Sequence, residues 1–400
     1  MNRRGLAGIM KQKLNILALY PSLPSLTKAA GDKTAFKFVE TLHCLGHRIT
    51  LLSFAFNGYD EADYRALEPL CERIALHDFG RGEKLRNMLA GWFLSPTLAA
   101  RRSAGFGRLI DAHIDAADLV HVEFTELLPW ARYIKARYPG KRVCYVAHDI
   151  VFQRKFREAR SCFFLNPWRD LDLFLTWRSE NAFLGEIDRV IVLNGKDAAL
   201  IARHGARCRV VVPYAERPLI GDGDRPAGVP ERYLVYFGAM SRPENYLAAL
   251  TFIRNCWPAL HREFPGLGLY VVGSRPHESL AAYHGRDNVV VTGFVENPYE
   301  YLAHALMTVA PITLGAGIKV KVLESLLVGT PVVAFPAGAE GIDLQRAEGL
   351  IEVNTPSRMV SEVRRCLTEG MPVSRGEIRA AAERAFDWGI TEEFLRGDYQ

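Results

Sequence analysis

Short apolar runs alternate with longer amphipathic stretches along most of this chain, and this alternation restricts the fold more than any other feature. The runs that we interpret as strands in the first half are 14–20, 48–54, 119–124, 143–147, 189–193 and 209–212. Between them, segments such as 33–45 and 168–184 carry apolar residues at helical spacing. Buried strands that alternate with helices predict a parallel, doubly wound sheet.

A segment rich in Pro, Gly and Asp, 213–230, interrupts the pattern, and the alternation then restarts. The second series of predicted strands is 233–237, 269–272, 288–292, 307–311 and 331–335. A chain of 400 residues is also long for a single core. We therefore predict an α/β fold of two tandem Rossmann-like domains facing a central cleft: 1–212, 213–375, and a helical segment 376–400 that we expect to pack back on the first domain.

Composition places the chain among globular proteins, with 49% hydrophobic and 24% charged residues. The N-terminus has no apolar segment long enough for a signal peptide, and no run of about 18 apolar residues is present, so we expect a cytoplasmic location. The seven cysteines have no C-x-x-C spacing. We interpret them as reduced, mostly buried thiols and expect neither a disulfide framework nor a zinc site.

Charge is divided unevenly along the chain. Residues 1–212 carry 32 Lys and Arg against 22 Asp and Glu, a net +10, and the remainder carries 18 against 23, a net −5. The stretch from Arg81 to Arg108 combines basic residues with Trp92 and Phe93. That mixture is typical of a peripheral contact with an anionic membrane surface, on the inner face for a cytoplasmic protein, and also of a helix whose apolar side is core.

The segment that carries the chemistry follows the predicted strand ending at Pro311. It reads Ile-Thr-Leu-Gly315-Ala-Gly-Ile-Lys319-Val-Lys-Val-Leu-Glu324, a glycine-rich turn leading into a helix. A helix start normally recruits acidic residues, yet here two lysines precede the first acid. Glycines that permit close approach, free N–H groups and two amines together favour a diphosphate cradle. The alternative is a tight turn with a surface ion pair between Lys321 and Glu324.

At these residues the sequence resembles the donor-binding signature of family-four glycosyltransferases of the two-Rossmann, GT-B type. The segments 46–49, 146–149, 188–194 and 290–295 also resemble motifs of that family, in the same order. The resemblance covers most of the chain. It implies a nucleotide-sugar donor and retention of the anomeric configuration.

The resemblance also implies roles for individual residues. Glu324 would bind the ribose, Lys319 or Lys321 would face the phosphates, and His148 would lie near the transferred sugar. We accordingly predict His148, Lys319 and Glu324 as catalytic residues. The predicted nucleotide-binding residues are Gly31, Gly238, Arg242, Gly315, Ala316, Gly317, Ile318, Lys319, Lys321 and Glu324.

Two departures from the family pattern concern the donor contacts. The family often has a first glutamate about eight residues before the ribose-binding one, where this chain has Ala316. Its Arg and Lys pair after the first strand of the second domain is reduced to Arg242. We expect Arg242 and Lys319 to share the phosphate charge.

Three further side chains follow predicted strands of the first domain. His148 precedes Asp149, an acid that we expect to fix its tautomer; a purely structural histidine is the alternative. Glu123 and Glu126 follow the strand 119–122 and are candidates for contacting an acceptor hydroxyl, although a helix cap explains Glu126 equally well.

The sequence thus predicts a hexosyltransferase-type glycosyltransferase of polysaccharide biosynthesis, acting on a saccharide or lipid-linked acceptor. No Asp-x-Asp metal motif is visible, so we expect no metal and no cofactor besides the donor. One alternative is a nicotinamide-dependent oxidoreductase, but the turn after the first strand lacks Gly-x-Gly-x-x-Gly. The other is a non-catalytic carbohydrate- or nucleotide-binding protein. We expect no nucleic-acid partner, because no stacking motif or recognition helix is present.

Overall fold

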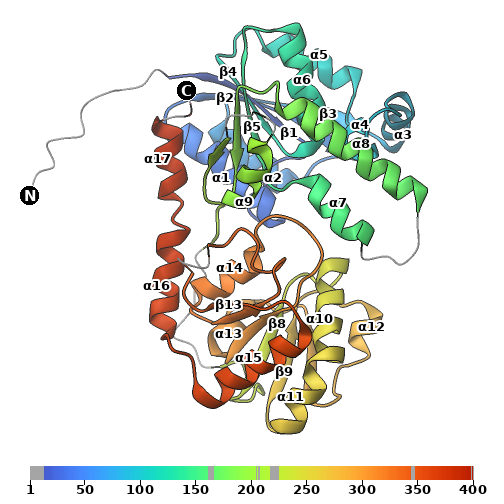
Figure 1. Cartoon of the computed structure of the whole chain (residues 1–400). Helices are drawn as coiled ribbons and strands as arrows, with labels where there is room; N and C mark the ends of the chain where they lie inside the picture. The colour runs from blue at the N-terminus through green and yellow to red at the C-terminus, as the bar shows by residue number, and fades with distance from the viewer. Residues whose placement is uncertain are drawn as a thin grey trace, which may run out of the picture. The chain divides into compact units, whose positions relative to one another are not determined.

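The computed structural model describes residues 13–160, 166–203, 205, 208–216, 225–343, 347–397 and 399. The chain divides into two compact units (Figure 1). Unit 1 comprises Met1–Phe152, Cys162–Tyr214 and Trp388–Gln400, and unit 2 comprises Gln153–Ser161 and Ala215–Asp387. The end of the chain therefore belongs to two units: residues up to Asp387 lie in unit 2 and the last thirteen in unit 1.

Each unit contains one parallel sheet. The strands of unit 1 are β1 (Asn15–Tyr20), β2 (Arg48–Phe56), β3 (Arg73–Phe79), β4 (Leu119–Glu123), β5 (Arg142–Ala147), β6 (Arg189–Val192) and β7 (Cys208–Val210). Those of unit 2 are β8 (Tyr233–Phe237), β9 (Gly268–Val272), β10 (Val289–Gly293), β11 (Met307–Ala310), β12 (Val332–Ala334) and β13 (Leu350–Glu352).

Helices connect the strands in both units. Unit 1 contains α1 (Ala30–Cys44), α2 (Glu61–Leu67), η1 (Glu68–Leu70), α3 (Arg81–Ala90), α4 (Pro96–Ala99), α5 (Ala104–His113), η2 (Thr125–Leu127), α6 (Leu128–Arg137), α8 (Pro167–Leu184), α9 (Gly195–Ala202) and α17 (Gly389–Gly397). The helix α7 (Val151–Arg160) begins in unit 1 and continues in unit 2. Unit 2 contains α10 (Pro243–Asn255), α11 (Trp257–Glu263), α12 (Glu278–Ala281), α13 (Pro298–His304), α14 (Val320–Leu327), α15 (Pro356–Glu369) and α16 (Arg375–Ala385).

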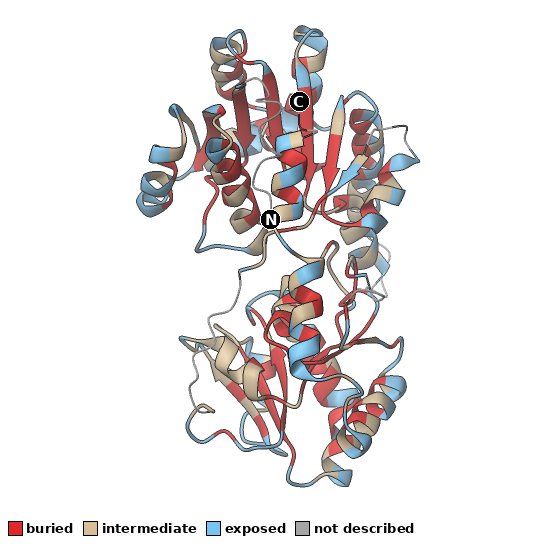
Figure 2. Ribbon diagram, turned by 90° about the vertical axis from the view of Figure 1, so that its left-hand side faces the viewer, coloured by how far each residue is buried: buried red, intermediate tan, exposed pale blue. Residues whose placement is uncertain are grey.

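The first strand of unit 1, β1, lies in the middle of its sheet. The order is β3-β2-β1-β4-β5-β6-β7, with all neighbours parallel. Successive residues of β1 enter opposite cores: Leu17 and Leu19 pack with α5, α6 and α8, whereas Ile16 and Ala18 pack with α1 and α17. Burial on both faces explains why these strands read as continuous apolar runs (Figure 2).

Unit 2 repeats this plan with the order β10-β9-β8-β11-β12-β13. Residues of α10, α11, α14, α15 and α16 form its larger core on one face of the sheet, and α13 covers the other. In both units the order reverses beside the first strand, at β1 and β4 in unit 1 and at β8 and β11 in unit 2. Open sheets of this kind bind ligands at the carboxyl ends of the strands at that reversal. The doubly wound α/β fold expected from the alternation is confirmed.

Two strands escape prediction from the sequence. The strand β3 carries His77 and Asp78 and is only partly buried at the sheet edge, so its apolar signal is weak. The strand β13 has three residues. The thiols are also less buried than expected: Cys144, Cys256 and Cys366 are buried, but Cys44 is exposed. Cys162 lies outside the described residues. Across the described part of the chain, no helix combines the length and the apolar character needed to cross a bilayer.

The last helix of the chain contributes to the core of unit 1. Phe394 of α17 is buried in the cluster that contains Phe38 of α1, and the indole of Trp388 donates to Thr41 at 3.0 Å. We predict that Phe394→Ala lowers the free energy of unfolding by about 3–5 kcal/mol, because it leaves a cavity in that core. Urea unfolding followed by circular dichroism measures this loss. Ile390→Ala, at an exposed position of the same helix, is the control and should change stability by less than about 0.5 kcal/mol. Equal effects would contradict the packing of α17.

Candidate active site

The glycine-rich turn of unit 2 lies at the carboxyl end of β11. Gly315 and Gly317 have φ angles of 84° and 71°, a region that L side chains rarely adopt, so this turn requires glycine at both positions. Lys319 is the N-cap of α14, where its side chain makes no capping hydrogen bond, and the first turn contains no acidic residue. The predicted helix start with basic rather than acidic side chains is therefore present.

The Lys319 amine lies inside this turn. It donates to the Gly317 carbonyl at 2.7 Å and lies 3.7 Å from a carboxylate oxygen of Glu340, and its side chain is 11% exposed. Glu340 is buried and accepts two hydrogen bonds from Arg157, at 2.5 and 2.9 Å. Arg157 also donates to the Gly315 carbonyl at 2.6 Å. One buried acid thus holds two cations beside the glycine turn.

Lys321 extends to the neighbouring strand end. Its amine donates to the side-chain oxygen of Asn245 and lies 5.6 Å from the centre of the Tyr236 ring. The turn after β8 passes close to this amine: Gly238 has a φ of 152°, which L side chains rarely adopt, and a Cβ placed there would lie 2.8 Å from the amine. Burial lowers the pKa of the Lys321 ammonium to about 7. A bound anion would favour its charged form.

Glu324 lies one turn further along α14. Its carboxylate accepts a hydrogen bond from the hydroxyl of Tyr299 at 3.0 Å. Tyr299 is in the first turn of α13, where Asn297 caps the helix by accepting from the Tyr299 backbone N–H at 3.1 Å. Sequence reasoning missed Tyr299; the Asn-Pro pair that starts this helix was the available signal.

Arg242 occupies the N-cap position of α10, after the Gly238 turn. Its guanidinium pairs with Glu244 at 2.6 Å and is largely exposed. Ala316 lies between Gly315 and Gly317, and Ile318 lies between Gly317 and Lys319; both are partly buried. The residues predicted around 315–324 thus cluster at the strand reversal of unit 2, and Arg242 lies at its solvent side.

In unit 1, His148 follows β5 and lies against the end of β4. Its Nε2 is 2.6 Å from a carboxylate oxygen of Glu123, and its ring stacks on Phe124 with centroids 4.0 Å apart. The expectation that Asp149 fixes the tautomer is therefore wrong, because Glu123 occupies that position. A carboxylate at Nε2 places the ring proton there and leaves Nδ1 as the acceptor.

Glu123 is fully buried and is the centre of a polar network. It accepts from the Tyr20 hydroxyl at 3.0 Å and lies 2.7 Å from Nε2 of His121, whose Nδ1 contacts the Tyr399 hydroxyl. Burial raises the pKa of Glu123, but hydrogen bonds from His121 and His148 outweigh it and lower the pKa to about 2. The expectation that Glu123 contacts an acceptor hydroxyl is wrong, since the carboxylate has no access to solvent.

The other ring nitrogen of His148 faces Gly31. A Cβ on Gly31 would lie 3.6 Å from Nδ1 and 3.2 Å from the Phe124 ring. Within the described residues this Nδ1 is buried and has no hydrogen-bond partner. Buried polar atoms are rarely left unpaired, so an unpaired acceptor beside a glycine in the first turn of α1 is suited to meet a ligand hydroxyl. Gly31 and His148, predicted separately, lie together.

The described residues of the site include no set of metal ligands. Within the ranges that the structure describes, no cluster of three or more His, Cys, Asp and Glu side chains is arranged to hold a metal ion.

Known proteins are similar to this chain in sequence over part of it and in fold over nearly all of it. Residues 231–369 match the family model "Glycosyl transferases group 1". Unit 2 therefore contains a region similar to that glycosyltransferase family. The matched residues include β8 to β13 and the whole 315–324 segment, so the family signature coincides with the cluster at the strand reversal of unit 2.

Solved structures share the fold over nearly the whole chain. Sucrose-phosphate synthase from Thermosynechococcus elongatus has a TM-score of 0.70 at 16% identity, covering 97% of this chain and 98% of that one. The Anabaena protein HepE in complex with UDP has a TM-score of 0.65 at 16% identity, covering 96% and 98%. TarM has a TM-score of 0.65 at 11% identity, covering 97% and 98%. No curated protein sequence matches the chain.

We predict that Glu123→Gln loosens the orientation of His148, because an amide cannot accept all the hydrogen bonds that converge on the carboxylate. The variant should lose about 1–3 kcal/mol of stability at neutral pH. The folded pKa of Glu123 is depressed from 4.5 to about 2, so its contribution is present above pH 4.5 and is lost as the pH falls towards 2.

Urea unfolding of both proteins across that pH range checks the prediction. The stability difference between wild type and Glu123→Gln should shrink on acidification, whereas Glu126→Gln, in the adjacent partly exposed turn, should track the wild type throughout. A difference that stays constant with pH would contradict an ionised, buried Glu123.

Proposed function

We propose that this chain is a glycosyltransferase that moves a sugar from a nucleotide-sugar donor to a saccharide or lipid-linked acceptor in polysaccharide biosynthesis, with retention of configuration and without a metal. The observation that carries the proposal is the positive charge gathered at the carboxyl ends of β8 and β11. Neither predicted lysine extends into open water: Lys319 is bound to Gly317 and Glu340, and Lys321 is partly buried, with its amine bound to Asn245 beside the Gly238 turn.

Breaking the bond between sugar and nucleotide leaves negative charge on the departing diphosphate. The Lys319 and Lys321 amines, the N–H groups at the start of α14 and Arg242 at the edge of the site supply fixed positive charge of the kind a metal supplies elsewhere. Glu324, oriented by Tyr299, is placed one turn along α14 to accept hydrogen bonds from ribose hydroxyls. HepE, with the same fold, has been solved with UDP and with UDP-glucose, which supports a nucleotide-sugar donor.

His148 is the group of unit 1 that we assign to the sugar. Its Nδ1 can accept a hydrogen bond from a sugar hydroxyl, and Gly31 leaves room for that hydroxyl to approach. Glu123 and Phe124 fix the ring by hydrogen bonding and stacking. We propose that this pair positions the donor sugar for attack by the acceptor oxygen at its anomeric carbon.

The proposed inner-face membrane contact of a cytoplasmic enzyme involves α3 and the residues after it. Leu85, Leu89 and Trp92 are 59%, 69% and 78% exposed, so this apolar side does not belong to the core, although Leu94 does. Residues 81–108 carry six basic residues against one acid, Glu83. An exposed apolar strip with a basic surround suits an anionic bilayer surface.

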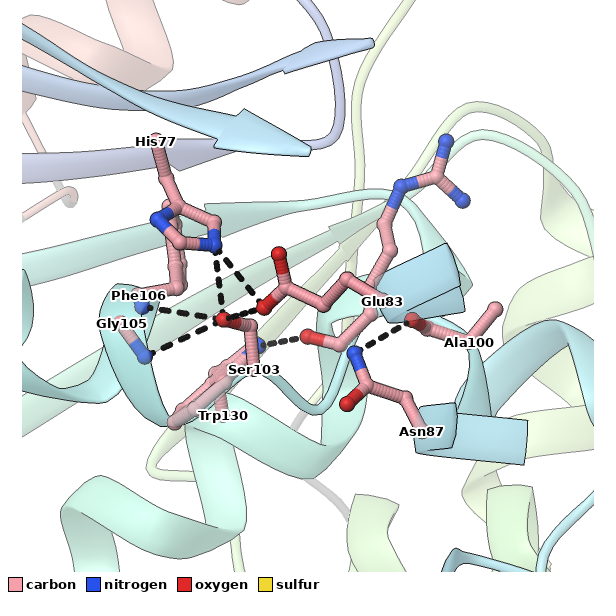
Figure 3. Close-up of polar contacts among 9 residues, drawn as sticks. His77, Glu83, Asn87, Ala100, Ser103, Gly105, Phe106 and Trp130 are labelled. Carbon is pink, nitrogen blue, oxygen red and sulfur yellow. Dashed lines mark hydrogen bonds and ion pairs between the residues drawn. The ribbon is translucent and has the colours of Figure 1, made fainter. Parts of the chain in front are cut away.

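Polar contacts on the inner side hold α3 in place (Figure 3). Ser103 caps α5 through the Gly105 and Phe106 N–H groups, and its hydroxyl also contacts His77 of β3 and Glu83 of α3. Although Ser, His and Glu meet here, the buried Ser103 acts as a cap and not as a nucleophile. The exposed side of α3 is therefore presented by a fixed helix.

An assay with a panel of nucleotide sugars, beginning with UDP-glucose, tests the proposal. We expect release of the nucleoside diphosphate in the presence of acceptor, unchanged by excess EDTA. Complete loss of activity on chelation, restored by a divalent cation, would overturn the metal-independent mechanism. Absence of transfer from every donor would overturn the function itself.

Titration calorimetry tests the nucleotide site. Lys319→Ala and Glu324→Ala should each weaken nucleoside diphosphate binding by about 1–3 kcal/mol, because each removes a hydrogen bond to or from a charged group. Arg262→Ala on α11 and Glu369→Ala on α15 change charge at exposed positions of the same unit and serve as controls. Unchanged affinity in both site variants would remove the assignment.

A further inference from the structure

A pocket of about 500 Å³ lies within unit 1, bordered by α6, α8 and the segment 93–102. Its size falls within the range of about 300–1,000 Å³ that small-molecule sites occupy. Its walls are largely apolar and come from Phe93, Leu94, Pro129, Ala136, Ala182 and Phe183. The pocket lies apart from the group formed by His148, Glu123 and Gly31, none of which lines it.

Three guanidinium groups line the same pocket: Arg102, Arg132 and Arg178. Arg178 donates to the Phe93 carbonyl at 2.8 Å, and Arg102 lies 5.5 Å from the centre of the Phe93 ring. Arg132 lies over Phe183 and is 3.7 Å from Glu186. In the described part of the chain, neither Arg102 nor Arg178 has a carboxylate within ion-pair distance. The pocket consequently combines apolar walls with three solvent-exposed guanidinium groups, of which only Arg132 is paired with an acid.

A buried hydroxyl in the pocket points independently to a ligand. Ser179 of α8 lines the pocket and is 2% exposed, and its hydroxyl has no hydrogen-bond partner among the described residues. An unpaired buried hydroxyl is unfavourable, and such groups are normally satisfied by a protein group, an ordered water or a bound molecule. A ligand with a hydrogen-bonding head group would satisfy it.

The surface around the pocket is unusually apolar. On α8, Trp168, Leu171, Phe174 and Trp177 are exposed at intervals of three residues, a spacing that keeps neighbouring side chains close on the helix surface. The exposed apolar residues of α3, Leu85 and Leu89, are followed in the chain by Trp92 and Phe93, which are also exposed, and Phe93 lines the pocket. Such a surface suits contact with hydrocarbon.

The basic charge of unit 1 and the apolar pocket walls indicate which kind of molecule can occupy the pocket. A second copy of this chain would bring another unit with the same basic excess, +10 over residues 1–212, against this one, and like charges repel. A free sugar would leave the apolar walls unsatisfied. A molecule with a hydrocarbon chain and an anionic head satisfies the walls, the arginines and Ser179 together.

We propose that this pocket binds an anionic amphiphile, with its chain against Phe93, Leu94 and Phe183 and its head group at Arg132, Arg178 and Ser179. The proposal rests on the proposed function only in taking the amphiphile to be a lipid-linked acceptor or a lipid of the adjoining bilayer.

Calorimetry with decyl phosphate, kept below its critical micelle concentration, tests the site on the full-length protein. We expect one molecule to bind per chain, and we expect no binding of inorganic phosphate or decanol at the same concentration. Ala182→Trp fills the pocket and should weaken binding at least tenfold, and Arg178→Ala should weaken it about tenfold. Ala66→Trp, at an exposed helical position of α2, is the matched control. Equal binding by Ala182→Trp and Ala66→Trp, or no binding by the wild type, would overturn the proposal.

Flotation with vesicles identifies the source of the amphiphile. If Ala182→Trp lowers binding to phosphatidylglycerol vesicles relative to Ala66→Trp, the pocket takes a bilayer lipid. If vesicle binding is unchanged while decyl phosphate binding is lost, the site takes a lipid outside the bilayer, such as an acceptor. UDP affinity, measured on the same variants, should stay unchanged, so a failed nucleotide site and a failed lipid site are distinguishable.

Discussion

The placement of two lysines at the start of a helix is the constraint on which the rest of unit 2 depends. A helix start repels cations and burial disfavours an ammonium, so this arrangement is maintained only with compensation. Glu340 supplies it for Lys319, and Asn245 supplies a neutral acceptor for Lys321. Glycines at 238, 315 and 317 let the backbone pass close to these amines. Burial lowers the pKa of the Lys321 ammonium to about 7, because the neutral Asn245 oxygen does not replace the water that burial removes.

In unit 1 the main feature is the fixed orientation of the His148 imidazole. Glu123 is buried without a cationic side chain of fixed charge, and its low pKa derives from two histidines. Tyr20 on β1 and Tyr399 at the end of the chain complete the network, so residues far apart in the sequence surround the carboxylate that binds Nε2 of His148. Because α17 packs in the same core as α1, the last residues of the chain support this arrangement. Precise orientation of a group that contacts substrate is worth more to catalysis than its mere presence.

A separate feature of unit 1 is the set of large apolar side chains that α3 and α8 expose. The inner side of α3 is fixed by Ser103, His77 and Glu83, while α3 and α8 both leave large apolar side chains in contact with solvent. Exposure of several such side chains on two helices is costly for a protein that remains in water. The proposed lipid contact rests on the basic residues of this region and on the apolar pocket that Phe93 and residues of α8 line, and its residues differ from those of the nucleotide site.

The sequence by itself determined the two doubly wound sheets, because strands buried on both faces must be apolar throughout and helices between them must be amphipathic. It also determined the 315–324 turn, since glycines and lysines at a helix start leave a local signature. It could not reveal Tyr299, Glu340 or Arg157, which reach the site from other elements, nor the exchange of Asp149 for Glu123 as the partner of His148. The edge strand β3 was missed because it is partly exposed, and its sequence therefore lacks a continuous apolar run. Only the tertiary structure decided those pairings, because contacts between distant residues follow from how the strands are ordered and the helices packed, which no local pattern records.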